Sequence, residues 1–168
     1  MKSIICDIDD TLAYAKYRVE LKKVISKTEI PPLITLPYIK WTYEMLKSLI
    51  KSGYHIYFVT VRITKCNNDT HEWLEKIWFN KKDYTLISND LQLQKINGDN
   101  YDMDWNRMKS YNVKSDLYDI HLDDKDISFV LEDNESCVQM WRYDKWLLCF
   151  QVNKDIAVNL VTKIKKKH

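Results

Sequence analysis

The fold of this chain is decided by one short N-terminal stretch, SIICDIDDTL at residues 3–12. Its first four residues are rich in β-formers and predict a short buried strand. Acidic side chains follow directly, because Asp7, Asp9 and Asp10 occupy three of the next four positions. In an open α/β sheet, ligands bind at the carboxyl ends of the strands. We therefore expect Asp7 and Asp9 to converge at the functional edge of a sheet.

Such a concentration of like charge is costly unless a cation lies within it. Oxygen ligands alone favour Mg²⁺, which proteins usually hold through one or two carboxylates together with waters and substrate phosphate. Acidic residues after a strand can equally cap or solvate a turn. The D-x-D pattern alone leaves both interpretations open, and segments further along the chain decide between them.

Strand-like and helix-like segments alternate along the rest of the chain. This alternation predicts right-handed βαβ crossovers and a mostly parallel sheet with helices on both faces, a three-layer α/β sandwich. The length of 168 residues fits one domain over residues 1–168. The segments 13–37 and 87–109 are the least regular. Strands are expected at 55–60, 84–88, 127–131 and 146–152, and helices at 38–52, from 69, at 115–122, at 135–143 and from about 156.

Tryptophan residues recur at amphipathic positions in the expected helices. Asp69 and Glu72 have the spacing of a capping box, which predicts the start of a helix. The apolar residues that follow include Trp73 and Trp78. We expect both of them, together with Trp141, to belong to the core.

Glycine is rare in this chain, which contains only Gly53 and Gly98. The glycine-rich phosphate-binding loops G-x-x-x-x-G-K-[ST] and G-x-G-x-x-G are therefore excluded. Any phosphate chemistry must rely on side chains, a metal ion or ordinary helix N-termini. Gly53 itself is placed to end the helix expected at 38–52.

Charge and cysteine content exclude further classes of protein. Lys and Arg total 26 against 24 Asp and Glu, a net charge of +2, which is too balanced for a dedicated nucleic-acid coat. The four cysteines lie far apart without a C-x-x-C pair, so reduced thiols fit better than a zinc site or disulfides. The sequence has no signal-peptide pattern and no membrane-length apolar run. We expect a soluble cytoplasmic protein without a membrane partner.

Polar side chains also follow two of the later strands. The second expected strand ends in Thr60, whose hydroxyl can donate to a phosphoryl oxygen, and Arg62 offers a planar fork to another oxygen. The strand at 127–131 is followed by Glu132 and Asp133, which would complete a metal site if this strand lies beside the first. Each feature alone has a structural explanation, since Thr commonly ends a strand and acids commonly cap a following helix.

Lys114 lies near the start of the helix before the Glu132-Asp133 pair and could neutralise both the carboxylates and a transferred phosphoryl group. The complete order is strand–D-x-D-x-T, strand–T, helix–K, strand–E-D. This order resembles the haloacid dehalogenase (HAD) superfamily of aspartyl-nucleophile phosphotransferases over essentially the whole chain. The resemblance implies a HAD-like, Rossmann-like fold with minimal or no cap, in which residues 13–37 form a small lid or substrate-contacting insertion.

A closer resemblance is visible downstream. LEDN at 131–134, VQMWR at 138–142 and an aromatic-rich strand after them look like the 3′-phosphatase domain of bacteriophage polynucleotide kinase-phosphatases. The V-T-V-R run and Lys114 are similar to that family's hydroxyl-x-Arg motif and catalytic lysine. In two departures, Asp10 replaces a glycine, and Glu132 replaces an aspartate and adds a methylene. Because the chain begins at the first aspartate motif, the kinase domain is expected to be absent.

The resemblance implies a role for each polar residue. Asp7 is the nucleophile that forms an aspartyl-phosphate, and Asp9 is the general acid and base. Dehalogenases and aspartyl-phosphate ATPases keep no acid two residues after the nucleophile, so Asp9 implies hydrolysis of a phosphomonoester. Thr60 and Lys114 are implied to bind phosphoryl oxygens. Further substrate contacts are implied for Thr11, Arg62, Lys16 and Arg18. The implied ligands of Mg²⁺ are Asp7, the main-chain carbonyl of Asp9, Asp133 and Glu132, of which Glu132 binds the ion either directly or through the second shell.

A nucleic-acid 3′ end is the substrate expected from this resemblance. The interval 13–37 is too short for a full cap domain, and an open site suits a large substrate. A small substrate such as a deoxynucleoside monophosphate is the alternative, and the sequence does not decide between DNA and RNA or whether the chain self-associates. Basic and aromatic residues of the interval either track phosphates and stack bases or form a solvated helix face, namely Tyr14, Lys16, Tyr17, Arg18, Lys22 and Lys23.

Two other classes of protein share parts of this pattern. A phosphorylation-dependent receiver module also places acids, Thr and Lys on a parallel sheet, but its phosphoacceptor lies on a middle strand outside any D-x-D. A catalytically silent binding protein on the same scaffold would normally lose one of the key residues, and this chain keeps Asp7, Asp9, Lys114 and Asp133.

Overall fold

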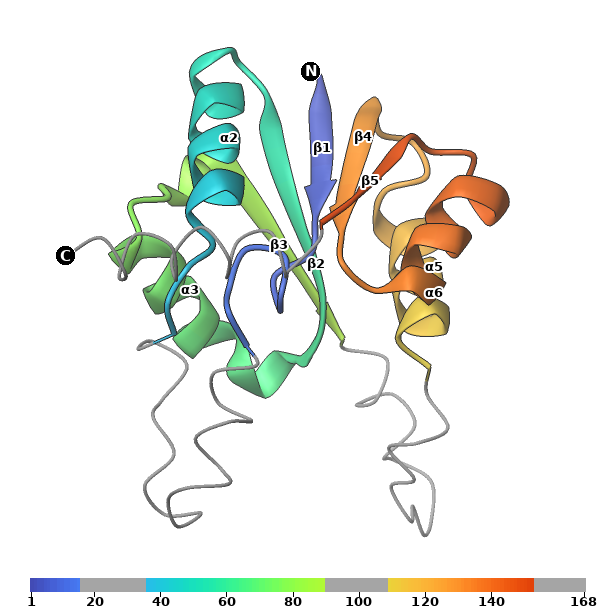
Figure 1. Cartoon of the computed structure of the whole chain (residues 1–168), viewed down its shortest axis with the longest axis horizontal. Coiled ribbons are helices and arrows are strands. Elements are labelled where there is room, and N and C mark those ends of the chain that lie inside the picture. Colours follow the sequence, from blue (N-terminus) through green and yellow to red (C-terminus); the bar gives the residue numbers. More distant parts are fainter. Residues whose placement is uncertain (16–35, 90–108, 153–168) are drawn as a thin grey trace, which may run out of the picture.

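The computed structural model describes residues 1–15, 36–89 and 109–152. Most of the expected insertion, including Lys16 and Arg18, and the helix expected from about 156 lie outside the described residues. The described part is a three-layer α/β sandwich in which a central sheet separates two layers of helices (Figure 1). The expected α/β fold class is confirmed.

The sheet consists, within the described residues, of β1 (Ser3–Cys6), β2 (His55–Ile63), β3 (Tyr84–Asn89), β4 (Ile127–Glu132) and β5 (Cys149–Gln151). All neighbouring strands are parallel, in the order β3-β2-β1-β4-β5. The central strand β1 pairs with β2 and β4 on its two sides, so that Cys6 lies beside both Phe58 and Leu131. The carboxyl ends of these three strands therefore meet at one edge of the sheet.

Helices cover both faces of the sheet (Figure 1). One face carries α2 (Lys40–Lys51) and α3 (Asn67–Lys76), and the other carries α5 (Ser110–His121) and α6 (Glu135–Gln139). None of the described helices has the length and apolar character needed to cross a membrane. The described residues also form shorter turns, namely the 3₁₀ turns η3 (Thr64–Cys66) and η4 (Lys81–Asp83) and the π-helical turn η5 (Met140–Asp144).

Alternating side chains of the strands build two separate cores. Ile4 on β1 packs with Leu46 of α2 on one face, whereas Ile5 packs with Val113 of α5 on the other. All four residues are buried. This alternation follows from the two-residue period of a strand that is covered on both faces.

The ends of α3 differ from the sequence prediction. The prediction that a capping box starts this helix at Asp69 is wrong, because α3 already begins at Asn67, directly after the turn η3. Trp73 and Trp141 lie in the core as expected, but Trp78 is 77% exposed. Trp78 follows α3 with a φ of 73°, and this left-handed residue ends the helix and directs its side chain out of the core.

The last strand is also shorter than the expected 146–152. The chain leaves α6 through the π-helical turn η5 and then passes Trp146, which has a φ of 55°. Pairing with β4 begins only at Cys149. The helix expected at 135–143 is therefore a short α-helix that continues as a π-helical turn.

The two ends of the insertion are hydrogen-bonded to each other. The N–H of Tyr14 donates to the carbonyl of Pro37 at 2.8 Å, and the N–H of Ile39 donates to the carbonyl of Leu12 at 2.7 Å. Ala13 pairs with both Asp9 and Tyr38. The insertion therefore begins and ends directly beside the loop that carries the D-x-D motif.

Candidate active site

Asp7 lies at the carboxyl end of the central strand. Its backbone N–H still donates to the carbonyl of Leu131 on β4 at 3.0 Å, so the side chain projects where the strand ends. The loop then turns through Asp10, whose φ of 64° lies in the left-handed region that favours glycine and tolerates Asp. The backbone thus explains why glycine suits this position. The same turn brings the Thr11 hydroxyl to 3.1 Å from Asp7 Oδ2.

A buried ion-pair network joins Asp7 to Lys114 and Glu132, and we refer to these three residues as the lysine network. Lys114 Nζ donates to Asp7 Oδ1 at 2.7 Å and to Glu132 Oε2 at 2.6 Å. Lys114 lies in the second turn of α5, and its side chain is only 3% exposed. Because a buried charge without a partner costs several kcal/mol, this ammonium requires both carboxylates around it.

The carboxylate of Glu132 is engaged at both oxygens. Oε1 accepts the backbone N–H groups of Asp133 and Asn134, each at 3.2 Å. Oε2 accepts from Lys114 and, at 3.3 Å, from the indole Nε1 of Trp141. The methylene that distinguishes Glu from Asp lets this carboxylate turn back over its own loop. Glu132 therefore holds both Lys114 and the start of the loop after β4.

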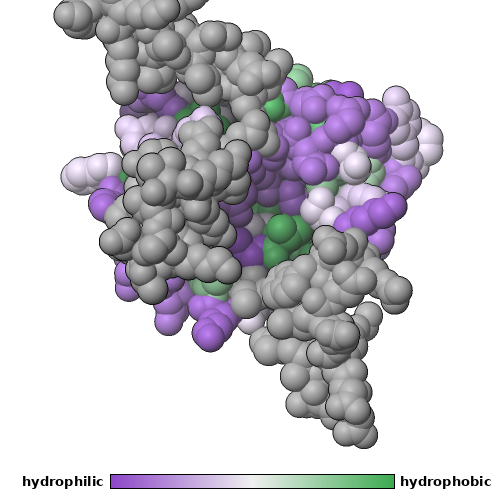
Figure 2. Space-filling model, turned by 60° about the horizontal axis from the view of Figure 1, so that its bottom comes forward, coloured by the Kyte–Doolittle hydropathy of each residue, from purple (hydrophilic) through white to green (hydrophobic). Residues whose placement is uncertain are grey.

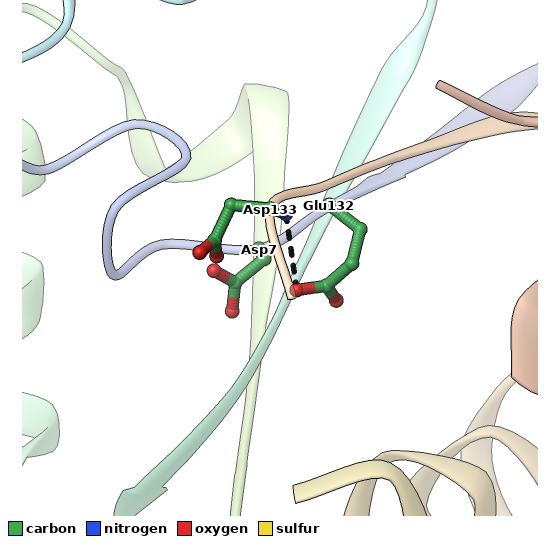
Figure 3. A group of neighbouring side chains, drawn as sticks. All are labelled: Asp7, Glu132 and Asp133. Atoms are coloured by element: carbon green, nitrogen blue, oxygen red, sulfur yellow. Dashed lines mark hydrogen bonds between the residues drawn. The ribbon is translucent and has the colours of Figure 1, made fainter. Parts of the chain in front are cut away.

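Three carboxylates are close enough to hold a metal ion among the described residues. One oxygen each from Asp7, Glu132 and Asp133 lies within 4.8 Å of the others. In Figure 3 the carboxylates of Asp7 and Asp133 face each other, whereas Glu132 turns towards the backbone of Asp133. The Thr11 hydroxyl lies 3.1 Å from Asp7 and 3.2 Å from Asp133 and ties the two together. This set of oxygen donors fits Mg²⁺.

Burial and neighbouring charge shift the protonation of the network. Burial raises the pKa of Asp7 well above its usual range, the ammonium of Lys114 opposes this shift, and the negative charges of Glu132 and Asp9 add to it. Burial alone would lower the pKa of Lys114, but the carboxylates of Asp7 and Glu132 outweigh it and raise that pKa. The two carboxylates therefore favour the charged ammonium form of Lys114. A metal ion beside Asp7 would favour the carboxylate form that a nucleophile needs.

Asp9 is paired with Arg62, and we refer to these two residues as the arginine pair. The guanidinium is bidentate, with Nε 2.8 Å from Asp9 Oδ2 and one terminal nitrogen 2.5 Å from Oδ1. Its other terminal nitrogen donates to the Thr70 hydroxyl at 3.1 Å, and that hydroxyl donates to the carbonyl of Cys66. The side chain of Asp9 is 34% exposed, against 8% for Arg62. A fixed guanidinium thus holds an acid that solvent can reach.

Three more of the predicted site residues lie within the described part of the chain, namely Thr60, Arg62 and Thr11. Thr60 is buried, and its hydroxyl accepts the backbone N–H of Arg62 at 3.2 Å. The guanidinium of Arg62 pairs with Asp9, and the hydroxyl of Thr11 lies between the carboxylates of Asp7 and Asp133. Both residues therefore contact acids of the site directly. The described surface at this edge of the sheet is largely hydrophilic (Figure 2). Lys16 and Arg18 lie outside the described residues.

Three contacts of the site were missed by the sequence analysis. Trp141 was assigned to the core alone, but a buried indole needs an acceptor for its N–H, and an acid nearby in sequence was a signal for one. The pairing of Asp9 with Arg62 had one signal in the sequence, their opposite charges, but the continuation of β2 past Thr60 that brings the two residues together had none. Thr70 had no signal, because nothing in its helix marks it as a partner of Arg62.

Residues 1–155 match the family described as the polynucleotide kinase PNKP phosphatase domain. This chain belongs to that family. It is a HAD-type phosphatase domain, as the order of its motifs implied. No curated protein sequence matches the chain significantly.

Solved structures of similar fold include two chains from complexes of Pnkp1, Rnl and Hen1. One is 23% identical with a TM-score of 0.67, over 90% of this chain and 45% of the other. The second, titled as an RNA repair complex, is 24% identical with a TM-score of 0.66, over 90% of this chain and 42% of the other. This phosphatase domain thus spans less than half the length of those chains.

A class C acid phosphatase from Bacillus anthracis with tungstate bound is a more distant structural relative. It is 17% identical with a TM-score of 0.51, over 81% of this chain and 53% of the other. At this level of identity the likeness concerns the fold. The α/β sheet of this chain is therefore shared with HAD phosphatases of different kinds.

Proposed function

We propose that this domain is a Mg²⁺-dependent phosphomonoesterase that acts through an aspartyl-phosphate and removes 3′-phosphates from nucleic-acid ends. The observation that carries the proposal is the contrast between two acids of one loop. Asp7 is buried in the lysine network, and Asp9, two residues later, is partly exposed in the arginine pair. A fixed nucleophile beside an accessible proton carrier is what the two steps of this reaction require.

In the first step, an oxygen of Asp7 attacks phosphorus and the bond to the leaving alkoxide oxygen breaks. Lys114 has three N–H donors, of which Asp7 and Glu132 accept two, and we expect the third to reach a phosphoryl oxygen. Asp9 delivers its proton to the leaving oxygen. Because Arg62 engages both oxygens of Asp9, we expect the substrate phosphate to compete for the guanidinium and to release Asp9 for this proton transfer.

In the second step, a water molecule attacks the phosphorus of the aspartyl-phosphate. Asp9, now a carboxylate, accepts a proton from this water, and phosphate leaves with the regenerated Asp7 carboxylate. We expect the hydroxyl of Thr60, which accepts the backbone N–H of Arg62, to donate to a phosphoryl oxygen. Mg²⁺, held by Asp7, Asp133 and the main-chain carbonyl of Asp9, would offset the repulsion between an anionic nucleophile and an anionic ester.

The family and the position of the insertion support a nucleic-acid end as substrate. The chain belongs to the PNKP phosphatase family, and two structures of similar fold come from Pnkp1 complexes, one of them titled as an RNA repair complex. The insertion between Ala13 and Tyr38 begins and ends beside the D-x-D loop. We propose that residues 13–37 form a small substrate-contacting lid, with Lys16 and Arg18 on the nucleic acid, within one domain of residues 1–168. Four cysteines outside disulfides suit a cytoplasmic protein.

Phosphate release from a panel of substrates tests this proposal. The panel contains DNA and RNA oligonucleotides with a 3′-phosphate, the same oligonucleotides with a 5′-phosphate, 3′-mononucleotides and an aryl phosphate, each with Mg²⁺ and with a chelator. The proposal expects the highest kcat/KM on a 3′-phosphorylated oligonucleotide and no turnover with the chelator. Faster release from mononucleotides would replace the 3′-end substrate by a small one, and full activity with the chelator would contradict the cation.

A further inference from the structure

We propose that Trp141 is a positioning residue of this site, which acts through Glu132 on Lys114. Trp141 lies in the π-helical turn η5 and is completely buried. Its indole N–H donates to Glu132 Oε2 at 3.3 Å, the same oxygen that accepts from Lys114 at 2.6 Å. The expected effect of Trp141 on kcat rests on the proposed function, whereas its expected effect on stability does not.

Trp141 contacts both the acid of the lysine network and the helix that carries its lysine. Besides its bond to Glu132, it packs edge-on against Tyr118, with ring centroids 5.8 Å apart and an interplanar angle of 74°. Tyr118 lies one turn after Lys114 on α5, so the same indole touches the acid and the helix that carries the lysine. Removing its N–H would leave Oε2 of Glu132 with Lys114 as its remaining donor among those described above.

Trp73 shows what a purely structural buried tryptophan does in this protein. It too is buried, but its indole N–H donates to the backbone carbonyl of Leu36 at 2.9 Å, in the core on the opposite face of the sheet. Trp141 instead donates to the side-chain carboxylate of the active site. Bonds to charged acceptors are stronger than bonds to neutral ones. In addition, π-helical turns occur often at functional sites.

The indole therefore limits how the Glu132 carboxylate can rotate. Oε1 is fixed by the backbone N–H groups of Asp133 and Asn134, and Oε2 is fixed by Lys114 and Trp141. Without the indole N–H, the Oε2 oxygen of Glu132 can rotate together with the ammonium of Lys114. Lys114 would then lose its position between Glu132 and Asp7. Because Trp141 does not contact the substrate, its loss should lower kcat and leave KM unchanged.

The kinetic test compares two Trp-to-Phe substitutions with the aryl phosphate as substrate. Trp141→Phe keeps an aromatic ring against Tyr118 and removes the N–H, and we expect kcat to fall roughly 10-fold, with KM within about twofold of the parent. Trp73→Phe removes an equally buried N–H outside the site and should leave kcat unchanged. Equal kcat values for the two variants would overturn the proposal.

A second test needs neither activity nor a cation. Urea unfolding without Mg²⁺ is measured for the parent, Trp141→Phe, Glu132→Gln and the double variant. If Trp141 acts through the charge of Glu132, its substitution should move the urea midpoint less than half as far in the Glu132→Gln background as in the parent. An equal movement in both backgrounds would overturn the proposal. Should Glu132→Gln not fold, Glu132→Asp serves, since its shorter side chain withdraws the carboxylate from the indole.

The two tests also separate this inference from the proposed function. If the parent releases no phosphate from any member of the panel, the proposed function fails, and the urea measurement alone decides the role of Trp141. If the parent is active and the urea effects are independent, the phosphatase stands and the role of Trp141 falls.

Discussion

The lysine network and the arginine pair begin two residues apart in the same loop but have contrasting surroundings. Around Asp7, an ammonium, a hydroxyl and a second carboxylate are all buried. Around Asp9, one guanidinium is buried behind a carboxylate that is 34% exposed. One half of the site is fixed by the interior of the protein, and the other half meets solvent.

The contrast teaches how one loop can hold two acids with different tasks. A nucleophile gains from a fixed position, and buried partners that compensate one another provide it. A proton carrier must exchange protons with the leaving group and with water, so it has to remain accessible. The residue after Asp9 is the left-handed Asp10, and the next residue, Thr11, donates its hydroxyl to Asp7.

Substitution of Asp7 should have the largest effect. Asp7→Asn removes the nucleophile while keeping the size of the side chain, and we expect phosphate release to fall by on the order of 10⁵-fold or more, as loss of the nucleophile does in other covalent hydrolases. Phosphate release from the aryl phosphate under Mg²⁺ measures this. A variant that works at the parent rate would end the assignment.

Substitution of Asp9 should lower the rate of phosphate release less than substitution of Asp7, and the loss should depend on the substrate. Asp9→Asn removes the proton carrier, for which we expect a loss of about 10²–10⁴-fold on a 3′-phosphorylated oligonucleotide. The aryl phosphate should lose less in the first step, because its leaving group needs little protonation. Rates of single turnovers on both substrates check this. Equal losses on the two would place Asp9 outside proton transfer.

The two halves should also differ in stability. Lys114→Met leaves two buried carboxylates without their cation, and we expect the free energy of unfolding to fall by about 3–5 kcal/mol. Arg62→Met breaks a pair whose acid faces solvent, and we expect a loss of about 1 kcal/mol. Urea unfolding of both variants without Mg²⁺ makes the comparison. A larger loss of unfolding free energy for Arg62→Met than for Lys114→Met would contradict the view that the lysine network is the rigidly held part of the site.

The smallest effect is expected at the turn that follows the two acids. Asp10→Gly suits a φ of 64°, and we expect full activity and a free energy of unfolding within about 1 kcal/mol of the parent. The matched variant Asp10→Val should lose about 1–2 kcal/mol, because a branched side chain is strained in this region. Thermal or urea unfolding distinguishes the two. Equal stability of the two variants would show that the turn carries no such requirement.

The sequence was sufficient to predict which strands meet at the site. Parallel strands that each end in polar residues must bring those residues to one edge, and this places Asp7 with Asp133 and predicts Thr60 nearby. The same reasoning covers Lys114, since the helix before β4 packs against the sheet. These contacts depend on topology, which alternation of strands and helices predicts well.

Contacts that depend on the course of the chain past the strand ends could not be predicted. β2 continues to Ile63, beyond Thr60, and this extension carries Arg62 to Asp9. The direction of the Glu132 carboxylate depends on one extra torsion angle. The exposure of Trp78 depends on a helix that ends in a left-handed residue other than glycine, which apolar spacing does not reveal.

The central claim is that Asp7 carries the phosphoryl group, and trapping the intermediate tests it most directly. The enzyme is mixed with a 3′-phosphorylated oligonucleotide and Mg²⁺, quenched in acid during turnover and treated with borohydride, which reduces an acyl phosphate of aspartate to homoserine. Mass spectrometry of the peptides should then find homoserine at position 7 and none in a sample that was not given substrate. Homoserine at another aspartate, or steady phosphate release with unmodified Asp7 throughout, would contradict the account.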